Sequence, residues 1–112
     1  MSKVQKDQAG IVYPGIVGKL GTNQNLTAGV TATASSAFGQ ETTLIRVATN
    51  SLTGAGSHVH FAIGTAPTAT TSTALIPCGV IEYIAVAPGD KISVLRGGAL
   101  DINVSVTEIT NA

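Results

Sequence analysis

Two histidines separated by one residue are the side chains best suited to metal chemistry in this sequence. His58-Val59-His60 places both imidazoles on one face of a strand, because successive side chains of a strand point to opposite faces. Zinc and iron suit imidazole, but such sites usually need three protein ligands, and the chain has no third histidine. Glu82 or Cys78 would have to complete the site from elsewhere. We therefore interpret the histidines as part of a polar face or subunit contact and predict no metal.

Residues for nucleophilic or acid–base catalysis are present but poorly arranged. A catalytic serine needs a histidine oriented by a carboxylate, and Ser57 and His58 are strand neighbours whose side chains diverge. Cys78 follows a proline and is interpreted as a small buried hydrophobic residue. The carboxylates beyond residue 21 show no pairing pattern and are Glu41, Glu82, Asp90, Asp101 and Glu108. We predict that no residue is catalytic and that the chain is not an enzyme.

Cofactor and nucleic-acid patterns are also missing. The glycine-rich run 15–21 contains a lysine but lacks the P-loop spacing, and the run 53–56 lacks a third glycine. Six basic residues balance six acidic ones, and the few aromatic residues are scattered, which disfavours nucleic-acid binding. No run approaches eighteen apolar residues, and the first residues lack the apolar stretch of a secretory signal. We expect a chain made in the cytoplasm, with no cofactor, nucleic-acid or membrane partner.

The elements that would carry these side chains are strands. Val, Ile and Thr make up 36 of 112 residues, and these β-branched types favour strands. Alternation of apolar and polar residues predicts strands at 30–35, 43–48, 58–63, 80–86, 91–95 and 100–107. The segment 80–86 is apolar nearly throughout, so we expect it to be covered on both faces. The turn sequence Ala87-Pro88-Gly89-Asp90 predicts that it pairs with 91–95.

Seven or so short strands at this spacing predict an all-β fold with a single β-sandwich, jelly-roll-like or immunoglobulin-like, over residues 22–112. The predicted interior consists of Val30, Ile45, Phe61, Ile63, Ile84, Val94, Ile102, Val104 and Val106. Residues 1–21 hold four glycines, one proline and the lysines Lys3, Lys6 and Lys19, with weak periodicity. We interpret them as an extended N-terminal arm with one short strand near 11–13.

A succession of short motifs between residues 58 and 109 resembles a known family. The motifs are VHFAIGTAPTAT at 59–70, LIP at 75–77, EYIAVAPGDKISV at 82–94 and VSVTEI at 104–109. In this order they resemble small virion structural proteins of tailed bacteriophages, the β-sandwich proteins that decorate or cement the head. The family pattern often has Cys or a small residue near His60 and Val at Phe61, so the chain departs from it there.

The resemblance implies a non-enzymatic virion protein, commonly a homotrimer, bound to the lattice of the major capsid protein on the outside of the capsid. In that case we expect the arm lysines Lys3, Lys6 and Lys19 to meet acidic capsid surface, and the loops of the sandwich to supply most of the affinity. The alternatives are a host-glycan-binding adhesin or a small head or tail fibre component. A metal-dependent enzyme using His58 and His60 is the least favoured function.

Overall fold

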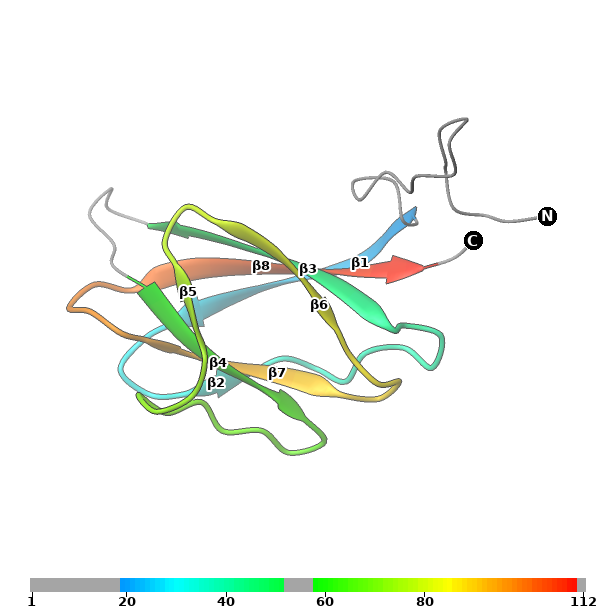
Figure 1. The fold of residues 1–112 in the computed structure, drawn as a ribbon, viewed down its shortest axis with the longest axis horizontal. Coiled ribbons are helices and arrows are strands. Elements are labelled where there is room, and N and C mark those ends of the chain that lie inside the picture. The colour runs from blue at the N-terminus through cyan, green and yellow to red at the C-terminus, as the bar shows by residue number, and fades with distance from the viewer. Residues whose placement is uncertain (1–18, 52–57, 111–112) are drawn as a thin grey trace, which may run out of the picture.

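The computed structural model describes residues 19–51 and 58–110, which form two four-stranded antiparallel sheets (Figure 1). In spatial order, the first sheet contains β1 (Lys19–Ala28), β8 (Ile102–Thr110), β3 (Leu44–Ser51) and β6 (Ile81–Ala85). The second contains β2 (Thr33–Ala34), β7 (Lys91–Arg96), β4 (His58–Gly64) and β5 (Leu75–Pro77). The predicted all-β sandwich is confirmed.

The strand pairing identifies the sandwich as a jelly roll. β1 pairs with β8, β2 with β7, β3 with β6, and β4 with β5. This is the pairing of one long antiparallel hairpin that has been rolled up into two sheets. The additional pairs β3–β8 and β4–β7 close each four-stranded sheet. Of the two predicted types of sandwich, the structure therefore has the jelly roll.

The core lies between the inward faces of the two sheets. On β8, Ile102, Val104 and Val106 are at most 1% exposed, as the predicted alternation requires. Ile45 and Val94 are also fully buried, while Phe61, Ile63 and Ile84 are partly buried and pack against this cluster. The predicted interior is thus confirmed at eight of its nine positions, five of them fully buried, and these eight are Ile45, Phe61, Ile63, Ile84, Val94, Ile102, Val104 and Val106.

Val30 is the wrong member of the predicted interior. Its side chain is 74% exposed, because β1 ends at Ala28 and the chain bends there to cross to the second sheet. Of the predicted strand 30–35, only Thr33 and Ala34 pair with another strand. The apolar–polar alternation of this stretch therefore belongs to a crossover between sheets, where side-chain period has no bearing on burial.

The turn at residues 87–90 is confirmed, but the hairpin that it predicted is wrong. The Asp90 N–H donates to the Ala87 carbonyl at 3.0 Å, the Asp90 carboxylate accepts from the Ala87 N–H at 2.9 Å, and Gly89 has a φ of 83°. However, β6 lies in the first sheet and β7 in the second. The turn is a corner between sheets, since its hydrogen bonds fix the reversal of the chain without requiring the flanking strands to pair.

The strand covered on both faces is β7, not the segment 80–86. Ile92, Ser93 and Val94 are at most 1% exposed, whereas Ile81 and Tyr83 of β6 are 50% and 47% exposed. The reason is the β4–β5 connection, whose buried Ala69 lies on the outward face of β7 and donates its N–H to the Ser93 hydroxyl at 3.0 Å, whereas β6 is an edge strand. Apolar content alone therefore misassigned the buried strand.

The connection between β2 and β3 is buried at three positions, Ser35, Phe38 and Thr42. Phe38 is 2% exposed and joins the core, and its N–H donates to the Asp90 carbonyl at 2.8 Å. Glu108 of β8, which is 7% exposed, accepts hydrogen bonds from the Thr42 hydroxyl at 2.5 Å and from the Gly39 N–H at 2.9 Å. This loop closes one end of the sandwich.

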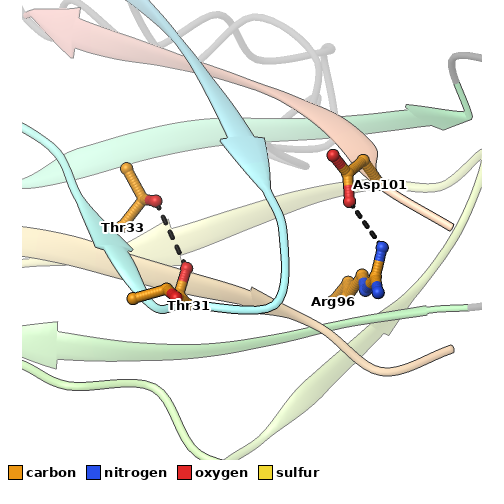
Figure 2. A network of polar contacts seen from close by, with 4 residues as sticks. All are labelled: Thr31, Thr33, Arg96 and Asp101. Carbon is orange, nitrogen blue, oxygen red and sulfur yellow. Dashed lines mark hydrogen bonds and ion pairs between the residues drawn. The ribbon is translucent and has the colours of Figure 1, made fainter. Parts of the chain in front are cut away.

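The opposite end carries an ion pair beside the β1–β2 bend (Figure 2). Arg96, at the end of β7, pairs with Asp101, just before β8, with a nitrogen–oxygen distance of 2.7 Å. The backbone N–H of Arg96 donates to the Gly29 carbonyl at 3.1 Å. The Thr33 hydroxyl donates to the Thr31 carbonyl at 3.4 Å. Because both charged side chains are partly exposed, the ion pair stabilises the fold by about 1 kcal/mol at most.

Candidate interaction surfaces

Of the three arm lysines, the structure places only Lys19. It is the exposed first residue of β1 and lies opposite Thr110 of β8. Residues 19–21 therefore belong to the sandwich, and the predicted boundary between arm and domain at residue 21 lies three residues too late. Lys3, Lys6 and the predicted short strand at 11–13 lie outside the described residues.

The outward face of the first sheet is polar where β1 and β8 meet. The Asn23 side-chain oxygen accepts hydrogen bonds from the Ser105 hydroxyl at 2.8 Å and from the Thr107 hydroxyl at 2.7 Å. The Asn23 side-chain amide also donates to the Asn25 side-chain oxygen at 3.3 Å. These four side chains therefore hydrogen-bond to one another across the β1–β8 pair.

The outward face of the second sheet is covered by the β4–β5 connection, residues 65–74, which we call the hydroxyl loop. Its Ala69 N–H donates to the Ser93 hydroxyl of β7 at 3.0 Å, and both residues are at most 3% exposed. A turn follows in which the Thr73 N–H and hydroxyl both donate to the Thr70 carbonyl, at 3.1 and 2.8 Å. The loop is therefore fastened to the sheet beneath it.

His60 forms a hydrogen bond to the same loop near the loop's C-terminal end. Its Nδ1 lies 3.0 Å from the Thr73 carbonyl oxygen, which can only accept, so Nδ1 carries the proton. His60 is 6% exposed although it lies on the outward face, because the loop covers it. The solvent side of the hydroxyl loop presents the exposed side chains Thr65, Thr68, Thr70, Thr71 and Ser72.

The two histidines pack against each other rather than opening toward a shared site. Their ring centroids are 4.9 Å apart, with an interplanar angle of 83°. The His58 ring lies directly over Gly97, where a Cβ atom would overlap it. Glu82 is in the other sheet, so the structure does not bring it to the histidines as a third ligand. Cys78 is partly buried between β5 and β6.

Gly97 is needed to accommodate the His58 ring, and this can be tested by adding one methyl group. We expect Gly97→Ala to lower the free energy of unfolding by about 1–2 kcal/mol, because the ring must move from its position beside His60. Gly64→Ala is the matched control, since a Cβ there meets nothing within 4 Å. Urea unfolding measures both, and a combined His58→Ala change should remove most of the Gly97→Ala effect. Equal losses for Gly97→Ala and Gly64→Ala would contradict the packing.

The described residues offer interaction surfaces rather than an enclosed site. Within 19–51 and 58–110 there is no pocket and no group of three His, Cys, Asp or Glu side chains placed to hold a metal ion. The same ranges contain no helix that is long and apolar enough to cross a membrane. The class that the structure defines is a jelly-roll domain with a fastened, hydroxyl-rich loop on one face.

Comparison with known proteins gives little further information. No protein-family model matches the chain, and no curated protein matches it either. A solved structure described as “Bacillus endospore appendages form a novel family of disulfide-linked pili” is similar at a TM-score of 0.42 and 17% sequence identity. That match covers 80% of this chain and 84% of the other. Similarity at this level carries no argument about function.

Sequence reasoning missed the fastened loop and the open edge of β6. Nothing local in the sequence indicates that Ala69 is buried against Ser93, since the two are 24 residues apart. The one available signal is that Ser93, a residue with a hydroxyl group, stands between the apolar residues Ile92 and Val94. It marks an outward position without showing what covers it.

Proposed function

We propose that this chain is a non-enzymatic virion structural protein that decorates or cements the head of a tailed bacteriophage. It binds the lattice of the major capsid protein from outside, as a homotrimer. The observation that carries the proposal is the hydroxyl loop, which is held against the second sheet through Ser93 and His60. The same loop holds the Thr65–Thr70 part of the motif run on which the phage resemblance depends.

A fastened, uncharged loop suits binding to a large protein lattice. Because the loop is already ordered by its own hydrogen bonds, little conformational entropy is lost on binding. Its exposed side chains carry hydroxyl and methyl groups but no charge, so binding requires no desolvation of ions. Three copies in a trimer would add avidity, which turns weak single contacts into stable attachment.

The arm lysines would contribute steering rather than most of the affinity. Lys19 is exposed at the start of β1, and Lys3 and Lys6 precede it in the sequence. Attraction between such lysines and acidic capsid surface is screened by salt over about 8 Å at physiological ionic strength. The contribution of the arm should therefore fall as salt concentration rises, while that of the hydroxyl loop should not.

Deletion of residues 2–18 and substitution in the hydroxyl loop test the two contributions separately. The deletion stops before β1, so we expect an unchanged melting temperature and a capsid occupancy that falls several-fold at low salt. Thr68→Arg changes an exposed loop position and should reduce occupancy at every salt concentration, with Thr27→Arg on the exposed face of β1 as its control. Co-sedimentation with capsids that lack the protein measures occupancy. Unchanged binding by the deletion and by Thr68→Arg would rule out the proposed contacts.

The alternative function is a host-glycan-binding adhesin or a small head or tail fibre component. Jelly rolls occur in lectin domains as well as in viral capsids, and hydroxyl side chains can hydrogen-bond sugars. A glycan array separates the two functions. Specific binding to a glycan together with no binding to capsids would favour the adhesin.

A further inference from the structure

Three of the four sheet edges are protected, and the edge at β6 is not. Unpaired edges expose backbone N–H and C=O groups to other chains, and proteins shorten, bulge or cover them. β2 has two residues, and β5 has three and ends at Pro77. β1 has a bulge between Leu20 and Asn23, and the Gln24 side chain ties it to Ser36 by hydrogen bonds of 2.8 and 3.3 Å.

The register of β6 decides which of its backbone groups face the open edge. Thr49 N–H donates to the Val80 carbonyl at 3.1 Å, and Val86 N–H donates to the Thr43 carbonyl at 3.0 Å. Because hydrogen-bonded pairs alternate along an antiparallel ladder, the even-numbered residues from 80 to 86 point their backbone groups toward β3. The backbone groups of Ile81, Tyr83 and Ala85 point away from β3, and no described residue hydrogen-bonds to them.

The same three residues expose apolar side chains on the outward face. Ile81 lies opposite Ala48, and Tyr83 lies opposite Arg46 of β3. About half of the Ile81 and Tyr83 side chains is exposed. A strand of five residues, three of which have open backbone groups, is long enough to form a strand pair.

We propose that β6 pairs in antiparallel fashion with β6 of a second copy of this chain, about a two-fold axis through Tyr83. In this register Tyr83 lies opposite the second copy's Tyr83, and Ile81 lies opposite the second copy's Ala85. All three pairs then use backbone groups that face the open edge, and each pair exchanges two hydrogen bonds. The two first sheets become one continuous sheet.

The charge on β6 is compatible with a second copy as the occupant and disfavours the alternative register centred on Glu82. The one charged residue of β6 is Glu82, and in the proposed register it lies opposite the second copy's Ile84 rather than opposite another carboxylate. Like charges directly opposite in a strand pair are destabilising, so the pairing avoids the main electrostatic penalty. The contact goes beyond capsid binding. It joins two single chains or two trimers, and it does not replace the contacts within a trimer.

Cysteine cross-linking tests the register in the full chain with Cys78→Ala as background. Tyr83→Cys should give a disulfide-linked dimer in most molecules, because the paired Cα atoms would be about 5.5 Å apart. Ala85→Cys is the matched control, since its two thiols would lie four residues apart, about 13 Å along the strand. It should stay unlinked alone and should link when mixed with Ile81→Cys.

Tyr83→Pro provides an independent measurement. It removes the outward N–H at the centre of the contact without removing a hydrogen bond to β3, so the melting temperature should change little. Sedimentation of the unmodified chain at tens of micromolar should give an even number of copies, and Tyr83→Pro should halve that mass. The proposal is overturned if Tyr83→Cys does not link, if Ala85→Cys alone links equally fast, or if Tyr83→Pro leaves the mass unchanged. None of these results depends on capsid binding.

Discussion

Replacing Val104 with aspartate is expected to abolish the folded state. Val104 is completely buried on β8, the strand that pairs with both β1 and β3. Its neighbours on the inward face are Ile102 and Val106, which offer no hydrogen-bonding side chain to a carboxylate. A buried charge without a partner costs several kcal/mol, which is comparable with the whole stability of a domain of this size. Circular dichroism should show loss of the strand signal.

Asn103→Asp is the matched control for this substitution. It introduces the same side chain one residue away, on the outward face of the same strand, where Asn103 is partly exposed. We expect a change in unfolding free energy of about 1 kcal/mol or less. If both variants unfold, β8 does not tolerate a charge on either face, and the burial of Val104 is not the specific cause. If Val104→Asp stays folded, the assignment of the inward face is wrong.

Glu108→Ala is expected to cause the second-largest loss of stability, about 3 kcal/mol. The Glu108 carboxylate accepts from the Thr42 hydroxyl and the Gly39 N–H, and its removal leaves both donors without that acceptor. Thr42 is buried, and a buried donor left unsatisfied costs about 1–3 kcal/mol, whereas Gly39 is exposed and water can replace its lost acceptor. The loop that holds Phe38 in the core should loosen as well, because Gly39 adjoins it. Urea unfolding curves measure the loss.

Conservative variants separate hydrogen bonding from packing at this site. Glu108→Gln keeps an oxygen acceptor and a similar volume, so it should lose less than half as much stability as Glu108→Ala. Thr42→Val removes one donor while keeping the shape, and the double variant with Glu108→Ala should lose less than the sum of the two single changes. Strict additivity would show that Glu108 and Thr42 do not interact.

The strands that could be predicted are those in which apolar and polar residues alternate along the chain, because this alternation itself indicates which side chains are buried. On β8, apolar and polar residues alternate without interruption from Ile102 to Thr107, so the inward face follows from sequence. Glu108 continues that inward face with a charged residue, and alternation alone would not assign it to the interior. Its burial depends on Gly39 and Thr42, which are 69 and 66 residues away in the chain.

The candidate site was less predictable than the fold, because its parts come from distant segments. The spacing of His58 and His60 correctly placed them on one strand face. However, the contact that gives His60 a structural role comes from Thr73, and the packing of His58 depends on Gly97. Neither partner can be identified from the histidine motif.

By itself, the sequence determined the β class, the positions of most strands and the turn at 87–90, because side-chain alternation and turn chemistry act over a few residues. The tertiary structure decided which strands share a sheet. The same turn could have closed a hairpin, but β7 instead pairs with β2 and β4 in the second sheet, where Ile92 and Val94 join the core. The tertiary structure also decided that β6 is an edge strand. A strand lies at an edge when no strand pairs with its second side, and this depends on where all the other strands of the sheet lie.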